Sequence, residues 1–303
     1  MTNLQKKEIV ETIKKEIPRL GSQGNLARKC KVSPATISQM ISENWDLISP
    51  EMWQKVANSI GHSSSEWQTV ETLPYVKFAQ NLEIAKDGSM FLMYSDDAGK
   101  GKTATLKDYH KKNADNNVFY LNCREWAKRE LVEELCTELG IEYGNISSDK
   151  KGLLIIEFFE KKANKKPQLL IDEIDKLRDP ALRWFIEFYN ALEGQISIVS
   201  SGGPHLEQRI KRGIKLKKQG YSEINSRFSG ILKIHGTRFE DCAKICNANG
   251  ITSKTTINDI WKEQNKVFED FEIEPGKFLS VKVITDLRRL KRVIQRELLK
   301  MKI

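Results

Sequence analysis

Apolar positions near the start of the chain recur every three or four residues, the spacing of one buried helix face. This spacing predicts a helix over residues 3–20, with two shorter helices after it. The polar run GHSSSE at residues 61–66 predicts the start of a flexible connection. We expect a small all-α domain over residues 1–62 and a linker over residues 63–79. The apolar positions of the first helix are Ile9, Ile13, Ile17 and Leu20.

From Met90 the pattern changes to short apolar runs that are separated by helical spacings. Strands that alternate with helices predict a parallel sheet covered on both faces. We expect this α/β domain to span residues 80–235. The predicted strands are Phe91–Tyr94, Val118–Leu121, Leu169–Ile171, Ile196–Val199 and Ile231–Ile234. The predicted helices are Ala104–Tyr109, Glu130–Leu139, Leu153–Lys162 and Ala181–Leu192.

Beyond His235 the pattern predicts helices and no further strands. The helical segments are Phe239–Ala248, Ile257–Gln264 and Asp286–Lys300. We therefore expect a separate helical subdomain over residues 236–303. The predicted fold class is α/β, with a parallel-sheet core, a helical C-terminal subdomain and a small all-α N-terminal domain.

The stretch SDDAGKGKT at residues 95–103 follows the first predicted strand and precedes a helix. It ends like the phosphate-binding pattern G-x-x-x-x-G-K-[ST], but Asp96 occupies the place of the first glycine. We expect Asp96 to be tolerated because aspartate adopts left-handed backbone geometry more readily than most residues. Two acids near a triphosphate oppose its charge, so the expectation is either weakened ATP affinity or a neighbouring cation such as Lys100 that offsets the charge. Lys102 would neutralise phosphate oxygens and Thr103 would ligate Mg²⁺. The predicted nucleotide contacts are Asp97, Ala98, Gly99, Lys100, Gly101, Lys102, Thr103 and Ala104.

A second motif strengthens the nucleotide assignment. The run LLIDE at residues 169–173 is an apolar strand that ends in two acids, 70 residues after Lys102. In a P-loop ATPase Asp172 would support the Mg²⁺ and Glu173 would polarise the attacking water. The two motifs in this order predict an ATP site that uses Mg²⁺ and hydrolyses ATP.

Further segments resemble the AAA+ ATPases. NSRF at residues 225–228 is similar to the arginine-finger segment of that family, and TDLRRL at residues 285–290 is similar to its sensor-two segment. The resemblance implies that Arg227 reads a neighbouring subunit's γ-phosphate and that Arg288 contacts the bound nucleotide, with Arg289 as the competing choice. The alternative for each arginine is a solvated surface position.

Two polar positions take weaker assignments from the same resemblance. Asn122 stands where many AAA+ members restrain the catalytic glutamate, or it caps a turn. Ser200 and Ser201 occupy the sensor-one region, where asparagine or threonine is more typical, and we assign Ser201 to the nucleotide site. This departure implies slow or partner-dependent hydrolysis.

The segment QGNLARKCKVSPATISQM at residues 23–40 matches a helix-turn-helix pattern. Ser33 would cap the second helix and Pro34 would begin it, while Lys31 holds the slot that glycine usually fills in the turn. The alternative is a small helical domain for protein contacts. The expected core positions are Leu26, Ala27, Val32, Ile37 and Met40. The predicted DNA contacts are Arg28, Lys29, Thr36, Ser38 and Gln39.

The charge balance makes a polyanionic partner plausible. The formal net charge is +9 and the isoelectric point is near 9.1. Part of this excess lies in a dense stretch that could contact DNA phosphates or could be a solvated helix face. Its predicted DNA contacts are Lys211, Arg212, Lys215, Lys217 and Lys218.

Other sequence features concern compartment. We expect no membrane association and a cytoplasmic protein of a bacterial host, since no run is apolar enough for a bilayer span or a signal peptide. Five scattered cysteines fit reduced thiols, and Cys242 with Cys246 is expected to be a packed pair rather than a metal site.

The domain order together with GKGKT, LLIDE, NSRF and TDLRRLKR resembles the phage Mu B family of transposition proteins. The resemblance implies ATP and Mg²⁺ as cofactors, and a homo-oligomeric filament on duplex DNA with little sequence preference and ATP between subunits. It further implies delivery of target DNA to a transposase, activation of that transposase, and disassembly controlled by hydrolysis. Two alternatives remain: a helicase-loader-like AAA+ ATPase, and a helix-turn-helix transcriptional regulator that senses nucleotide.

Overall fold

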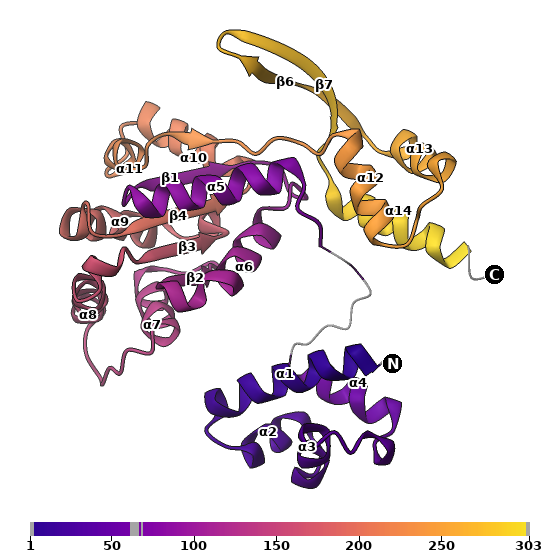
Figure 1. The fold of residues 1–303 in the computed structure, drawn as a ribbon. Coiled ribbons are helices and arrows are strands. Elements are labelled where there is room, and N and C mark those ends of the chain that lie inside the picture. Colours follow the sequence, from indigo (N-terminus) through magenta and orange to yellow (C-terminus); the bar gives the residue numbers. More distant parts are fainter. Residues whose placement is uncertain (1–2, 61–66, 68, 301–303) are drawn as a thin grey trace. The chain divides into compact units, whose positions relative to one another are not determined.

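The computed structural model comprises two compact units, Met1–Gln68 and Thr69–Ile303, each described here by itself (Figure 1). The structure describes residues 3–60, 67 and 69–300. Within the predicted linker, residues 63–66 and 68 lie outside the described residues.

The rest of the linker prediction is wrong at its C-terminal end, because residues 73–79 belong to helix α5 (Leu73–Asp87). Thr72 accepts a hydrogen bond from the N–H of Tyr75 and so caps this helix. Its apolar face, including Phe78 and Leu82, is buried against the sheet.

The described residues of the first unit contain four α-helices, one more than the three that the sequence pattern predicted. They are α1 (Asn3–Leu20), α2 (Gln23–Cys30), α3 (Pro34–Ile41) and α4 (Pro50–Ser59). The hydroxyl of Ser33 accepts from the N–H of Thr36 at 3.1 Å and caps α3. Lys31 adopts φ 55° in the turn, the left-handed geometry expected of a residue in a glycine slot. Leu26, Ile37 and Trp53 are fully buried in the core of this unit.

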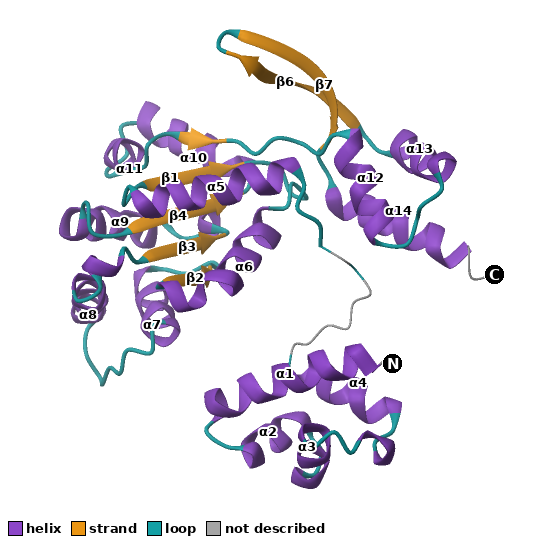
Figure 2. Cartoon of the chain, viewed as in Figure 1, coloured by secondary structure: helices purple, strands orange, loops and turns teal. Residues whose placement is uncertain are grey.

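A five-stranded parallel sheet, in the order β2-β3-β4-β1-β5, forms the centre of the second unit (Figure 2). Because all its strands are parallel, their carboxyl ends meet at one edge, where ligands of open α/β sheets bind. The strands are β1 (Phe91–Ser95), β2 (Val118–Asn122), β3 (Gln168–Asp172), β4 (Ser197–Gly202) and β5 (Ile231–Leu232).

Helices cover both faces of this sheet, which explains why its strands read as continuous apolar runs. Helices α5 and α6 (Lys102–Asn113) pack on one face with Leu92, Tyr94 and Leu170. The other face, which carries Phe91 and Met93, is covered by a larger set of helices. These are α7 (Lys128–Glu138), α8 (Ser148–Glu160), α9 (Asp179–Leu192), α10 (Pro204–Lys215) and α11 (Tyr221–Arg227).

The C-terminal subdomain contains the expected helices together with an unexpected β-hairpin. The helices are α12 (Phe239–Ala248), α13 (Lys254–Glu263) and α14 (Leu287–Lys300). The expectation that strands end at His235 is wrong, because β6 (Lys266–Glu274) and β7 (Lys277–Ile284) form a long antiparallel hairpin that projects from these helices (Figure 1). Gly276 makes the turn at φ 77°. Phe268 and Phe278 are largely exposed, so the hairpin lacks the one-sided apolar alternation that identifies a half-buried strand.

Candidate nucleotide site at the carboxyl edge of the sheet

The phosphate loop joins β1 to the N-terminus of α6, as the motif requires. Gly99 (φ 94°) and Gly101 (φ 89°) occupy backbone conformations that side-chain-bearing residues rarely adopt. Gly99 also lies against the start of α14. A Cβ atom added to Gly99 would be 2.6 Å from Oδ1 of Asp286. The carbonyl of Gly99 accepts from the N–H of Leu287 at 2.9 Å. The loop therefore contacts the C-terminal subdomain directly.

Lys102 lies at the first position of α6, and its ammonium is held inside the loop. Nζ donates to the carbonyls of Asp96 and Asp97, each at 2.7 Å. Burial lowers the pKa of Lys102, and the negative charges of Asp96 and Asp172 oppose that shift. A cation in this position can neutralise phosphate oxygens that reach the same loop. Thr103 follows it on the first turn of α6, and Ala104 is exposed beside it.

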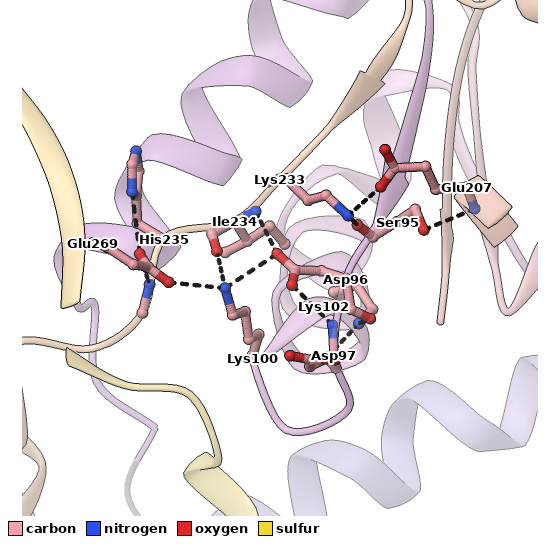
Figure 3. Close-up of polar contacts among 11 residues, drawn as sticks. Ser95, Asp96, Asp97, Lys100, Lys102, Glu207, Lys233, Ile234, His235 and Glu269 are labelled. Atoms are coloured by element: carbon pink, nitrogen blue, oxygen red, sulfur yellow. Dashed lines mark hydrogen bonds and ion pairs between the residues drawn. The ribbon is translucent and has the colours of Figure 1, made fainter. Parts of the chain in front are cut away.

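Asp96 fits the first-glycine position for a reason the sequence did not reveal. The expectation that it would use left-handed geometry is wrong, since Asp96 is not among the residues with positive φ. Its buried carboxylate instead accepts from the N–H of Asp97 at 2.8 Å and of Ile234 at 2.9 Å, and it pairs with Lys100 at 3.3 Å (Figure 3). The charge offset expected from Lys100 is therefore present as an ion pair.

Asp172, at the end of β3, is held by three donors. Oδ1 accepts from Ser201 Oγ at 2.5 Å and from the N–H of Glu173 at 3.0 Å, and Oδ2 accepts from the Tyr120 hydroxyl at 3.1 Å. Burial and the neighbouring Asp172 charge raise the pKa of Tyr120 well above its ordinary value. Both carboxylate oxygens are thus oriented, as the second shell of a metal ligand usually is. Ser201, assigned to the nucleotide itself, is fully buried and contacts Asp172.

Glu173 stands just beyond the strand, at φ 56° and partly exposed. Its carboxylate pairs with Lys176 Nζ at 2.5 Å. Asn122 is exposed at the end of β2, directly across from Asp172 in the sheet register. Glu173 therefore pairs with Lys176, and its restraint by Asn122 stays a prediction.

The two predicted catalytic arginines lie outside this cluster. Arg227 donates through Nη2 to Asn190 at 2.8 Å and stacks over the Tyr189 ring, so its side chain is held at the end of α11. Arg288 is exposed on the first turn of α14, one residue after the contact with the loop. The competing Arg289 donates to the carbonyl of Glu263, away from the loop.

The predicted DNA contacts fall into two sets. In the first unit Arg28, Lys29 and Ser38 are exposed and Gln39 is half-buried, but Thr36 is 7% exposed and its hydroxyl contacts Ser33. The prediction that Thr36 faces DNA is therefore wrong, because it lies on the buried side of α3. In the second unit the predicted contacts are all exposed at the end of α10 and in the turn beyond it. They are Lys211, Arg212, Lys215, Lys217 and Lys218.

A hollow of about 460 Å³ opens beside this basic turn. Arg212 and Lys218 line it together with Arg209, which is anchored to Asp179 at 2.5 Å and to backbone carbonyls. With Arg209 and Asp179 compensating one another, Arg212 and Lys218 give the hollow a positive lining.

Sequence reasoning missed three residues near the site. Tyr120 donates to Asp172 from the neighbouring strand. Figure 3 shows the other two contacts: Lys233 donates to the carbonyl of Ser95 at 2.6 Å, and Glu269 on the hairpin reaches Lys100 at 3.0 Å. The position of Tyr120, one residue before the end of a predicted strand, was an available signal. The other two contacts arise only from the tertiary fold.

This donor set fits a magnesium nucleotide. Mg²⁺ usually takes one or two protein ligands and completes its shell with waters and phosphate oxygens. One hydroxyl, Thr103, and one oriented carboxylate, Asp172, would suit that role, while Lys102 and the loop N–H groups would hold phosphates. Among the described residues no group of three or more His, Cys, Asp or Glu side chains could hold a metal by itself. When bound, Mg²⁺ would supply charge neutralisation at the phosphates.

The cysteines and the helices bear on the expectations about thiols and membrane spans. All five cysteines are free and buried, including Cys242 and Cys246. In the described part of the chain no helix has the length and apolarity needed to cross a bilayer.

The comparisons with known proteins agree with the site. Residues 85–210 match the family model described as an AAA domain. With the strand order and the phosphate loop, this match identifies an AAA domain over residues 85–210 and supports an ATPase. The chain also resembles the Mu-like prophage FluMu DNA transposition protein B of Haemophilus influenzae, with 22% identity over 237 residues that cover 76% of this chain and 80% of that protein.

Two solved structures are among those that resemble part of this chain. The Aeropyrum pernix ORC1 protein in complex with DNA is 12% identical, with a TM-score of 0.48, and the match covers 80% of this chain and 63% of that one. Cdc6p from Pyrobaculum aerophilum is 16% identical, with a TM-score of 0.45, over 61% of this chain and 52% of that one. This chain thus spans between about half and two thirds of the length of these structures.

Proposed function

We propose that this ATPase acts in DNA transposition, binding duplex DNA as an ATP-dependent filament that delivers target DNA to a transposase and activates it. The observation that carries the proposal is the similarity to a DNA transposition protein B over 80% of that protein's length, in a chain whose phosphate loop and Asp172 would suit a magnesium nucleotide. Hydrolysis, with Glu173 polarising water, would release the filament from DNA. The compartment proposed is the cytoplasm of a bacterial host.

The surface proposed for the DNA backbone is the basic end of α10. Its five cationic side chains are exposed, and Lys211 pairs with Glu207 at 2.6 Å. Arg212 and Lys218 converge on the 460 Å³ hollow, which offers one phosphate two cations. Lys and Arg contacts of this kind bind phosphates without reading sequence. Repetition along a filament would make modest single contacts strong.

The first unit would add a second DNA contact. Ser38 and Gln39 lie on α3, the proposed recognition helix, with Arg28 and Lys29 on α2 near phosphates. Arg227 would act on the nucleotide of the neighbouring subunit and Arg288 on its own subunit's nucleotide.

The test is binding to long random-sequence duplex DNA with ATP, with ADP or without nucleotide, read by electrophoretic shift and negative-stain microscopy. We expect cooperative filaments with ATP only, and none for Lys102→Ala. In salt titrations Arg212→Ala should lower the slope of log K against log [salt] by about 0.9 if Arg212 neutralises one phosphate. Lys150→Ala, which changes an exposed lysine on α8, is the matched control and should leave the slope unchanged.

The same experiment separates the alternatives. Binding to discrete sites that is equally strong without ATP would favour a nucleotide-sensing regulator. Absence of DNA binding together with a stoichiometric helicase complex would favour a helicase-loader-like role. Either result would contradict the transposition proposal.

A further inference from the structure

The phosphate loop is tied to the β6–β7 hairpin through the residue that breaks its consensus. Asp96 makes no use of glycine's backbone freedom, but its side chain is 8% exposed and accepts from the N–H of Ile234. Ile234 lies in the segment that leads from β5 to the C-terminal subdomain. Asp96 therefore fixes this junction to the start of the phosphate loop.

Lys100 continues the connection outward. Its ammonium, also 8% exposed by side chain, contacts Asp96 at 3.3 Å, the carbonyl of Ile234 at 2.8 Å and Glu269 Oε1 at 3.0 Å (Figure 3). Three acceptors surround it, two of them carboxylates. In this arrangement Lys100 serves the junction and the hairpin rather than a phosphate.

Glu269 completes the link on the hairpin side. Its second oxygen accepts from the N–H of Gly236 at 2.8 Å and lies 3.3 Å from Nδ1 of His235. Gly236 is pressed against β7, where an added Cβ would be 2.5 Å from the Val283 side chain. The next residue, Thr237, exchanges two backbone hydrogen bonds of 2.8 Å with Ile284. The junction and the hairpin base are therefore joined by direct contacts.

The other strand of the hairpin returns to the same loop. After β7 ends at Ile284, the N–H of Leu287 donates to the carbonyl of Gly99, and Asp286 packs on Gly99 itself. Both strands are thus connected to the phosphate loop, one through Lys100 and Glu269 and the other through Gly99. A change in loop conformation has to be accommodated at the hairpin base.

We propose that the β6–β7 hairpin changes its orientation with the nucleotide state, and that Asp96, Lys100 and Glu269 are the positioning residues that transmit the change. Phosphates that bind the loop N–H groups and Lys102 add negative charge beside Asp96 and Lys100, which alters the balance of the ion pairs. Glu269 lies on a hairpin that also contacts its surroundings through Phe271, which stacks on His235, and whose tip at residues 274–280 is exposed. This inference rests on nucleotide binding as part of the proposed function.

The experiment measures the distance between spin labels on Ser222→Cys, exposed on α11, and Ser280→Cys, exposed on β7. All five native thiols are buried, so the labels should react at the introduced sites. Distances are recorded with a non-hydrolysable ATP analogue, with ADP and without nucleotide. Nucleotide binding is measured separately by titration with fluorescent ATP.

We expect the label distance to differ between the analogue-bound and nucleotide-free protein. Glu269→Gln should reduce or abolish that difference in protein that still binds nucleotide, as the separate fluorescent-ATP titration of the variant checks. Asp270→Asn, the same change at the exposed neighbour on β6, is the matched control and should behave like the wild type. Lys102→Ala should show neither binding nor a distance change.

Three outcomes would overturn the proposal. Nucleotide binding without any distance change in the wild type would refute the link and leave the ATP site intact. A distance change of the same size in Glu269→Gln would show that the hairpin moves by another route. Absence of nucleotide binding in the wild type would refute the ATP site, and the link with it.

Discussion

Ser201→Ala is expected to weaken Mg²⁺-dependent hydrolysis by loosening Asp172. The Ser201 hydroxyl donates to Asp172 at 2.5 Å, and the two side chains are 0% and 2% exposed. A hydrogen bond to a charged group contributes about 1.5–3 kcal/mol. Asp172 would keep Tyr120 and the Glu173 N–H as donors, so it should remain in place but with one oxygen less firmly oriented.

We expect the Mg²⁺ concentration for half-maximal ATPase activity to rise by about 10- to 100-fold, the usual effect of removing the partner of a metal ligand. The assay is steady-state phosphate release at saturating ATP across a Mg²⁺ titration. Circular dichroism and urea unfolding should confirm that the variant is folded.

Ser200→Ala is the matched control, because Ser200 is equally buried on the same strand. Its hydroxyl donates to the carbonyl of Leu92 at 3.3 Å and does not contact Asp172. It should lower the free energy of unfolding by about 0.5–1.5 kcal/mol and leave the Mg²⁺ titration unchanged. Equal Mg²⁺ titrations for the two variants would refute the reasoning.

Further predictions concern the nucleotide loop, the catalytic glutamate and the basic turn. Lys102→Ala should abolish fluorescent-ATP binding; unchanged binding would remove this loop as the site. Burial lowers the pKa of Lys102 below the ordinary lysine value of about 10.4, and only the ammonium form neutralises phosphate. In the wild type, ATP affinity should therefore be full at neutral pH and should be lost as the pH rises through this lowered pKa. A midpoint at or above the ordinary lysine value, in titrations at increasing pH, would contradict this. Glu173→Gln should keep ATP binding and slow phosphate release, whereas wild-type turnover would mean that another group activates water. Gly213→Ala should lower the free energy of unfolding by about 1–3 kcal/mol, because the new Cβ would lie 2.3 Å from the Tyr221 ring. Urea unfolding measures this free energy, and Gly144→Ala, where nothing lies within 4 Å of the new Cβ, is the control. Equal free energies for the two variants would refute the packing argument.

Much of the nucleotide site could be predicted because its signals are local. Gly99 and Gly101 have positive φ, a local backbone conformation that glycine adopts without steric cost. The apolar runs of β1 and β3 are buried, as their composition predicts. Parallel strands then bring the loop after β1 and the acids after β3 to one edge of the sheet. The residues Lys102 and Asp172 follow from these rules without coordinates.

The hairpin escaped prediction because its pattern is not amphipathic. Strands are recognised from sequence when one face is buried, and here Val267, Phe268, Phe278 and Leu279 are exposed among charged neighbours. The Pro-Gly pair at residues 275–276, between segments rich in β-branched and aromatic residues, was the usable signal.

The sequence by itself determined which chemistry this protein carries, because the phosphate loop and the strand that ends in Asp172 and Glu173 are set by short-range backbone preferences and burial. Only the tertiary structure decided what holds those groups. Ser201 reaches Asp172 through cross-strand register, and Lys100 meets Glu269 across 169 residues of chain. Contacts of this kind depend on how separate elements pack. A hydrophobic pattern does not determine which polar side chains of distant elements come into contact.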